Sequence, residues 1–153
     1  AALLLQALVD SDCAVWLSPA LAASDAAAWL RFHTGCRWAA SPAAARFLWI
    51  AEGDALPPLA TLNAGTHEYP DQSATCVVEV AAVGDAEAEA FVLTGPGIAT
   101  DQSLSVHGLP GDFADQWDTN HRSFPRGVDL FLATPTHIAG LPRSTRVRAT
   151  QEA

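Results

Sequence analysis

The stretch LRFHTG, residues 30–35, places an arginine, a histidine and a threonine together after an alanine-rich run. Arg31 can bind an anion through its guanidinium group, and His33 can transfer a proton near neutral pH. The same residues also suit a helix end, because cations are stabilised there and glycine commonly follows the last turn. We favour a helix end in which Arg31 and His33 face inward against a sheet. The alternative is that Arg31, His33 and Thr34 face outward to meet a ligand or another subunit.

A second candidate is the stretch TGPGI at 94–98, in which Gly95 and Gly97 flank a proline. Glycine-rich loops bind phosphates through successive backbone N–H groups. Pro96 has no N–H to donate, and neither a GxGxxG nor a GK[ST] pattern is present. A tight turn at the end of a strand is at least as well supported. Both readings stay open, because ligands often bind at strand ends.

The third group of candidates lies between residues 124 and 146. Asp129 begins a buried apolar run, so its carboxylate needs an arginine or backbone N–H groups as partners, and we favour this structural role over acid–base chemistry. Arg126 belongs to the preceding turn, FPRG. The stretch PRSTR at 142–146 places Arg143 and Thr145 close together as a candidate oxyanion site, although such groups near the end of a chain are commonly solvated.

Several chemistries are excluded or disfavoured by residue content. All eight basic side chains are arginine, so neither a pyridoxal Schiff base nor a phosphate-loop lysine can form. The stretch GTHEYPD lacks the second histidine of a zinc-binding HExxH, and Pro70 would break the helix that presents such ligands. No GxSxG is present, and Cys13, Cys36 and Cys76 lack metal-site spacing. We therefore predict no metal, no cofactor and no catalytic residue of a known hydrolase type.

The elements that position these residues can be read from hydrophobic patterns. We expect helices at 1–9, 24–33 and 113–121, and short buried strands at 13–18, 46–51 and 128–133. Residues 75–83 and 90–95 should form an antiparallel hairpin, with further strands at 37–40, 103–106 and 137–142. Residues 52–74, with three prolines, should form a long connection. Alternating helices and strands followed by strand pairs predict an α/β fold with a mixed sheet.

Length and charge bound the protein further. At 153 residues the chain fits one domain, and its net charge of −9 disfavours binding to nucleic acid or to an anionic membrane. The apolar opening at 1–9 lacks a basic flank and is too short to span a bilayer. The three cysteines indicate reduced thiols, so we predict a cytoplasmic protein.

Five stretches occur in an order that resembles a known family. They are LRFHTG, LNAGTHEYPDQSATCVVEV, LTGPGI, FPRGVDLFL and LPRSTRV. In this order they resemble the PhnH family, one of the components of the phosphonate carbon–phosphorus lyase, across nearly the whole chain. The departure is at the N-terminus, where the family has an additional segment ahead of the first apolar helix.

The resemblance implies a three-layer α/β sandwich with a mixed sheet, similar to the large domain of pyridoxal-phosphate-dependent transferases but without that cofactor. It also implies a homodimer that assembles with the G, I and J subunits of the lyase complex. The implied function is an essential non-catalytic subunit that supports ATP-dependent formation of ribose 1-phosphonate 5-triphosphate. The alternative is a subunit whose loops around His33, Gly95 and Arg143 converge on a nucleotide or phosphonate.

Overall fold

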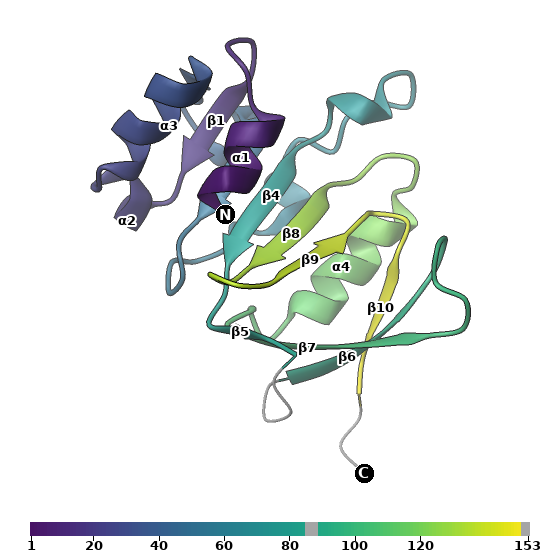
Figure 1. The fold of residues 1–153 in the computed structure, drawn as a ribbon. Coiled ribbons are helices and arrows are strands. Elements are labelled where there is room, and N and C mark those ends of the chain that lie inside the picture. The colour runs from purple at the N-terminus through teal and green to yellow at the C-terminus, as the bar shows by residue number, and fades with distance from the viewer. Residues whose placement is uncertain (85–88, 151–153) are drawn as a thin grey trace.

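A computed structural model describes residues 1–84 and 89–150 of the chain. The fold is built on a six-stranded sheet whose two faces are covered differently, one by helices and the other by a helix together with a second sheet (Figure 1).

The six-stranded sheet is mixed, as predicted. Counted from the β2 edge, the first four pairings are parallel: β2–β1, β1–β3, β3–β4 and β4–β8. The last strand, β9, pairs with β8 in the antiparallel direction. The strands in spatial order are β2 (Arg37–Trp38), β1 (Ala14–Leu17), β3 (Phe47–Ile50), β4 (Thr75–Glu79), β8 (Asp129–Ala133) and β9 (Ile138–Leu141). The central strands are nearly continuous apolar runs because both faces of a parallel sheet are buried.

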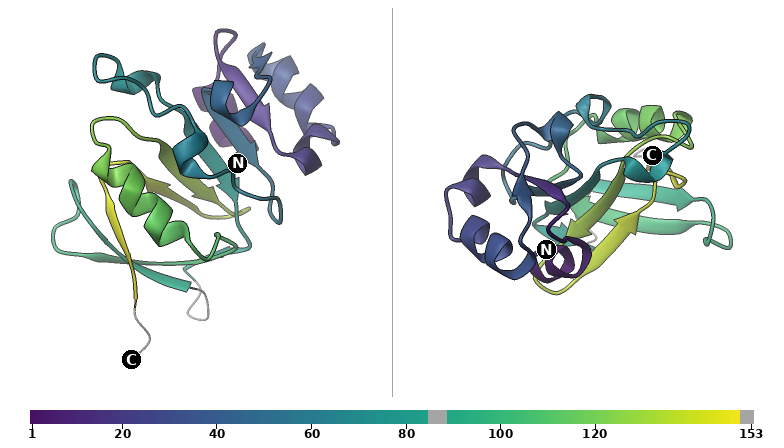
Figure 2. Two further views of the ribbon diagram at one scale, coloured as in Figure 1. Left: turned by 180° about the vertical axis from the view of Figure 1, so that it is seen from behind. Right: turned by 90° about the horizontal axis from the view of Figure 1, so that it is seen from above.

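Three helices cover one face of this sheet. They are α1 (Ala2–Leu8), α2 (Pro19–Ala22) and α3 (Ala26–Thr34). Leu5 of α1 and Leu30 of α3 are fully buried against a group of strand side chains that includes Val15 and Val77. The two views in Figure 2 show these helices on the side of the sheet away from α4 (Phe113–Arg122).

The opposite face packs against α4 and a second, antiparallel sheet. The order of that sheet is β10 (Arg146–Ala149), β6 (Glu89–Thr94), β7 (Gln102–His107) and β5 (Ala82–Val83). Trp117 and Phe113 of α4 and Phe91 of β6 are the largest side chains buried in this layer. They share one core cluster with Leu48, Ile50 and Leu130 of the six-stranded sheet. The sheet is thus the middle of three layers. Likeness to the large domain of pyridoxal-phosphate-dependent transferases stays a prediction.

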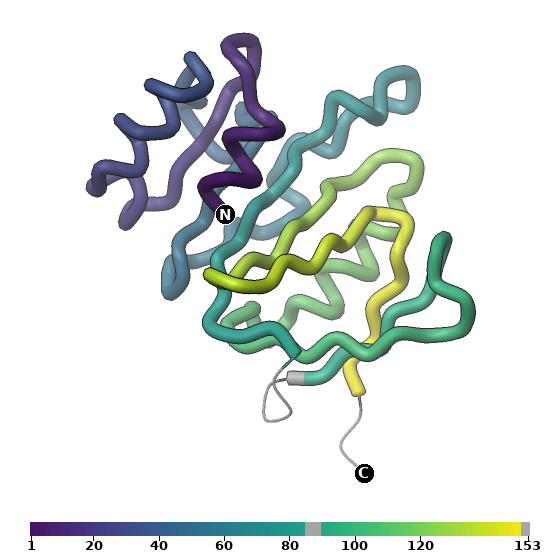
Figure 3. The backbone as a smooth tube through the Cα atoms, viewed as in Figure 1, coloured from purple at the N-terminus to yellow at the C-terminus, as the bar shows by residue number. Residues whose placement is uncertain are grey.

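The predicted hairpin between residues 75–83 and 90–95 is wrong. β4 lies between β3 and β8 in the first sheet, whereas β6 pairs with β7 and β10 in the second. The chain leaves the first sheet after Glu79, and its next strand, β5, pairs with β7 (Figure 3). One apolar run therefore supplies strands to two sheets. The turn that the prediction placed at 84–90 lies partly outside the described residues.

Other elements follow the sequence closely. The strands expected at 128–133 and 137–142 are β8 and β9, which pair with each other. The connection expected at 52–74 contains the short 3₁₀ turns η2 (Leu59–Thr61) and η3 (Pro70–Gln72). A further 3₁₀ turn, η1 (Pro42–Ala44), lies between β2 and β3. Ser24 helps begin α3, since its Oγ accepts a hydrogen bond from the Ala26 N–H at 3.1 Å.

Candidate functional site

The end of α3 is a helix terminus, as predicted, but its basic side chains face outward. Arg31 and His33 lie in the last turn and are exposed, so the expectation that they face inward against the sheet is wrong. Thr34 secures the terminus: its Oγ1 donates to the Leu30 carbonyl at 2.8 Å and accepts from the Cys36 N–H at 3.2 Å. The physical reason is helix phase, because Leu30 takes the one buried position of α3.

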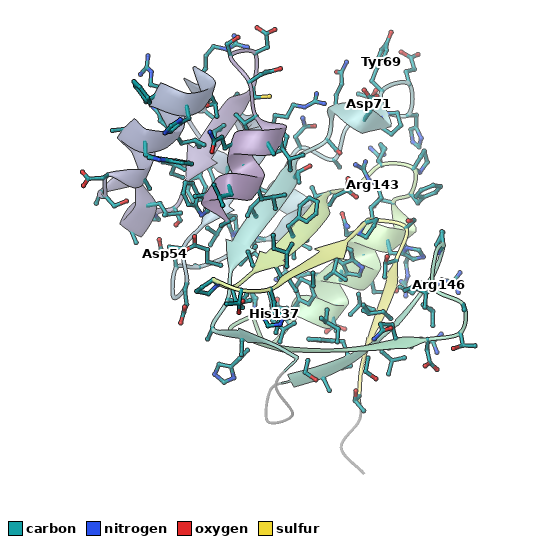
Figure 4. The ribbon with its side chains drawn as sticks, viewed as in Figure 1. Asp54, Tyr69, Asp71, His137, Arg143 and Arg146 are labelled. Carbon is teal, nitrogen blue, oxygen red and sulfur yellow. The ribbon has the colours of Figure 1, made fainter. Side chains whose placement is uncertain are left out.

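His33 belongs to a small aromatic group at the surface. Its ring centroid lies 4.6 Å from that of Trp29 and 5.1 Å from that of Phe32. Phe32 is 85% exposed, so this group presents an apolar surface to solvent. α3 covers the part of the sheet formed by β1, whereas Arg143 follows β9 at the far edge (Figures 1 and 4). The structure therefore does not bring Arg31, His33 and Thr34 together with Arg143.

Arg143 and Asp129 form the most heavily bonded polar group of the described chain. Asp129 stands at the start of β8, and Arg143 follows the end of β9, which runs antiparallel to it. The carboxylate accepts from the Arg143 backbone N–H at 2.8 Å, from its Nε at 3.1 Å, and from its Nη2. The partner that Asp129 was expected to need is thus both an arginine and a backbone amide.

The remaining donors of Arg143 reach across to the connection before β4 and to the turn between α4 and β8. Nη1 donates to the Pro70 carbonyl at 2.7 Å and lies 3.4 Å from the Pro125 carbonyl, and Nη2 donates to Ser73 Oγ at 2.5 Å. All five N–H groups of the guanidinium are therefore engaged within the protein. Arg143 ties three loops together at the amino-terminal edge of the parallel strands, beneath Asp71 and Tyr69 in Figure 4.

Gly95 lies against the same loop. Its φ is +144°, and a Cβ placed there would approach the Ser144 carbonyl oxygen to 3.0 Å. The loop is held from the other side by Trp117, whose Nε1 donates to the carbonyl of the buried Thr145 at 2.8 Å. Gly97 has a φ of +85° in an exposed turn that closes with a bond from the Ile98 N–H to the Gly95 carbonyl. The TGPGI stretch is a tight turn at the end of β6.

Arg126 lies in the turn between α4 and β8, next to the cis Phe124–Pro125 bond. Its Nε is buried and has no hydrogen-bond partner among the described residues. The turn itself is fixed by Asn120, which exchanges two hydrogen bonds with the backbone of Val128, at 2.8 and 2.9 Å. Arg126, Asp129, Arg143, Gly95 and Thr145 thus gather in one region of the protein.

A shallow cavity of about 350 Å³ adjoins this region. Most of its lining is apolar, contributed by prolines and by Phe124, and its polar side chains are those of Asp71, Asp129, Arg143 and Ser144. With the guanidinium of Arg143 already bonded and two carboxylates present, the cavity offers a bound anion little attraction. Tyr69 and Phe124 beside it are 55% and 60% exposed. The surface suits contact with another apolar surface better than it suits phosphate chemistry.

The three cysteines are free thiols without the surroundings of a nucleophile. Cys36 and Cys76 are buried, and burial raises the pKa of the Cys76 thiol to about 12, with a smaller contribution from the charge of Asp129. Burial also raises the pKa of Cys13, whose Sγ lies 3.2 Å from Asp10 Oδ1. Reactive cysteines have a lowered pKa, so neither Cys13 nor Cys76 is poised to attack a substrate.

The raised pKa of Cys76 predicts a loss of stability at alkaline pH. In the unfolded chain this thiol ionises near its ordinary value of 9.0, whereas in the folded chain it stays protonated up to about 12. The stabilisation is therefore complete below pH 9 and declines as the pH rises toward 12. Urea unfolding at pH 7 and pH 10 in reductant should show the wild type losing about 1 kcal/mol more than Cys76→Ala. An equal loss of unfolding free energy in the wild type and in Cys76→Ala would contradict the raised pKa of Cys76.

Two kinds of feature are absent from residues 1–84 and 89–150. No three histidine, cysteine or acidic side chains are grouped so that they could hold a metal ion. Within the same ranges, no helix combines the length and the apolar character that a membrane crossing requires.

A second polar cluster was not singled out from the sequence. His121 of α4 accepts a hydrogen bond from Arg146 of β10, and these two residues share a cleft with Arg122 and Arg148. Arg146 is part of the PRSTR stretch, but no local pattern indicates that α4 and β10 meet. The only feature of the sequence that points to this cluster is the density of arginine after residue 120, where five of the eight arginines lie.

Comparison with known proteins agrees with the order of motifs. A family model described as bacterial phosphonate metabolism protein (PhnH) matches residues 1–148. The chain is 41% identical over 140 residues to "Alpha-D-ribose 1-methylphosphonate 5-triphosphate synthase subunit PhnH" of Rhizobium meliloti, covering 92% of this chain and 69% of the relative. It is 40% identical over 147 residues to "Putative C-P lyase subunit protein HtxG" of Stutzerimonas stutzeri, covering 95% and 70%. The chain therefore belongs to the PhnH family of bacterial phosphonate metabolism proteins.

Proposed function

We propose that this chain is an essential, non-catalytic subunit of a carbon–phosphorus lyase complex in the cytoplasm. In that role it supports ATP-dependent formation of ribose 1-phosphonate 5-triphosphate from a phosphonate. The names of the two relatives, a subunit of a ribose methylphosphonate triphosphate synthase and a putative C–P lyase subunit, support the assignment to this step.

One observation carries the non-catalytic part of the proposal. Arg143, the strongest candidate for binding a phosphonate, uses all five guanidinium N–H groups to hold Asp129 and two other loops of its own chain. Arg31 and His33 lie at the other edge of the sheet, so they cannot complete a pocket with it. Arg143 is thus occupied by structural hydrogen bonds, and Arg31 and His33 lie too far from it to share a site. This arrangement favours a subunit that acts through contacts with other proteins rather than through its own catalytic residues.

The proposed partners are the G, I and J subunits, with a homodimer when the chain is alone. The surface beside the cavity at Arg143 supports this, because Tyr69 and Phe124 are more than half exposed next to several prolines. Exposed aromatic side chains grouped in this way are typical of protein interfaces. We assign this surface to contact with the other subunits of the complex.

A second candidate function is a nucleotide- or phosphonate-binding subunit that lends residues to the transfer step. It requires cationic side chains with free donors around a cavity. Arg143 does not meet this requirement, whereas the cleft between α4 and β10 does.

Reconstitution tests the proposal. The G, I and J subunits are purified with and without this chain, and ATP consumption is measured with methylphosphonate as the second substrate. We expect no turnover by this chain alone, none by the other three subunits, and activity when all four are combined. Turnover by the isolated chain would contradict the non-catalytic role, and full activity without it would contradict the essential role.

A matched pair of variants tests the proposed surface. The double variant Tyr69→Ser/Phe124→Ser should fold but lose co-purification with the other subunits. The control is Ile138→Ser, because Ile138 is equally exposed, at 55%, but lies at the opposite end of β9 from Arg143. If both variants co-purified with the other subunits equally well, the interface would have to lie elsewhere on the molecule.

A further inference from the structure

The cleft between α4 and β10 gathers positive charge on an acidic protein. Its volume is about 340 Å³, and it is lined by Asp118, His121, Arg122, Arg146, Val147 and Arg148. We call this the arginine cleft. It contains three of the eight arginines and one acidic side chain, in a chain whose net charge is −9. A local excess of positive charge of this kind is a binding surface for anions.

The two arginines of β10 are presented on one face of the strand. Arg146 pairs with Thr94 and Arg148 with Val92, while the residue between them, Val147, points into the core. Side chains two residues apart on a strand point the same way, with Cα atoms about 7 Å apart. A ligand with two adjacent anionic groups can therefore meet both guanidinium groups at once.

His121 holds Arg146 in position. Its Nδ1 lies 3.0 Å from the Arg143 carbonyl oxygen, which can only accept, so Nδ1 carries the proton. Nε2 is then an acceptor, and the Arg146 Nε–H donates to it at 3.3 Å. This bond uses one donor and leaves the two Nη groups of Arg146, which have no other hydrogen-bond partner among the described residues.

Arg122 differs from the two strand arginines. It already forms an ion pair with Asp118, at 2.6 Å, one turn earlier on α4, and its side chain is 77% exposed. Its guanidinium is therefore already partly engaged, whereas Arg146 and Arg148 keep donors that have no partner among the described residues. In the described ranges, neither Arg146 nor Arg148 forms an ion pair with an acidic side chain.

We propose that the arginine cleft binds a polyphosphate group, such as the triphosphate of a nucleotide or of a phosphorylated sugar. The volume falls in the range of small-molecule sites, and adjacent phosphates match two guanidinium groups on one strand face. The site belongs to the isolated chain, so it does not rest on assembly with other subunits and is tested separately from the proposed function.

Calorimetric titration of the purified chain tests this directly. The probes are sodium tripolyphosphate, ATP, inorganic phosphate and methylphosphonate, at low ionic strength because screening weakens such contacts. We expect tripolyphosphate and ATP to bind at least tenfold more tightly than the two single-phosphorus anions. Equal affinity for tripolyphosphate and ATP would mean that phosphates alone are recognised, and tighter ATP binding would add a contact to the nucleoside. Both outcomes support the proposal.

Variants separate the cleft from general electrostatics. Arg146→Gln and Arg148→Gln should each weaken tripolyphosphate binding about tenfold, the effect of losing a charge-assisted hydrogen bond of about 1.4 kcal/mol. The control is Arg31→Gln, which removes the same charge from an exposed position on α3 and should change affinity less than twofold. Both strand arginines are exposed, so the variants should fold.

A second readout does not depend on mutation. The ring signals of His121 in NMR spectra should shift on addition of tripolyphosphate, while those of His33 should not. No binding of tripolyphosphate or ATP at millimolar concentration would overturn the proposal, as would equal losses in Arg31→Gln and Arg146→Gln. Binding of a glutamate-rich peptide without binding of tripolyphosphate would also overturn it and make the cleft a docking surface for an acidic protein.

Discussion

Replacement of Trp117 by alanine will lower the free energy of unfolding by about 3–5 kcal/mol, the range for removing a large aromatic side chain from a core. Trp117 is fully buried between the two sheets, and its ring lies 5.8 Å from that of Phe113, which in turn lies 5.8 Å from Phe91. The loss has two parts. A cavity replaces the indole, and the carbonyl of Thr145 loses the hydrogen bond that Nε1 supplies.

Two further variants divide this effect. Trp117→Phe keeps most of the apolar contact but removes the donor, so it should cost about 1–2 kcal/mol. Trp38→Ala is the control, because Trp38 lies on the edge strand β2 and is 39% exposed, and it should cost less than half as much as Trp117→Ala. Urea unfolding followed by circular dichroism measures all three. A similar loss for Trp38→Ala and Trp117→Ala would contradict the central place of Trp117 in the core.

Replacement of Arg143 by methionine is expected to destabilise the protein by about 2–4 kcal/mol. The side chain is 14% exposed and that of Asp129 is 30% exposed, so removing the guanidinium leaves a largely buried carboxylate without its charged partner. Carbonyl oxygens of Pro70 and Pro125 and the hydroxyl of Ser73 lose donors as well. The partial exposure of the pair places the expected cost below that of a fully buried one.

A double-mutant cycle measures the pair itself. Arg143→Met, Asp129→Asn and the combined variant should reveal a coupling free energy of about 1–3 kcal/mol, because the two residues share several hydrogen bonds. The matched control is Arg122→Met. Its ion pair with Asp118 is exposed and lies within one helix, so the change should cost only about 0.3–0.5 kcal/mol. Equal costs for Arg122→Met and Arg143→Met would show that Arg143 does not organise the loops.

The elements with strong local signals were predictable from the sequence, and their partners were not. Gly35 was placed at the end of α3 and adopts a φ of +68°, and the strand at 128–133 was found one residue shorter, as β8. The run 75–83 was correctly predicted as extended, yet it joins two sheets. Hydrophobic alternation indicates which residues are buried but not which strand lies beside them.

In the candidate site, too, a local requirement was predictable from the sequence but the residues that meet it were not. The requirement that Asp129 have a charged or amide partner came from its position before an apolar run, because a buried carboxylate without one is costly. That the partner is Arg143, and that it also reaches Ser73, depends on loops about 70 residues apart in sequence. The bond between His121 and Arg146 likewise crosses 25 residues, and no spacing rule connects them.

The passage of the chain between the two sheets bears on how the protein unfolds. The chain leaves the first sheet between β4 and β5, returns to it between β7 and β8, and leaves it again between β9 and β10. Neither sheet is a continuous segment, so neither can detach while the other keeps its full set of strands. Amide hydrogen exchange should therefore find the slowest protons of β4 and of β6 opening together, in one cooperative event rather than two.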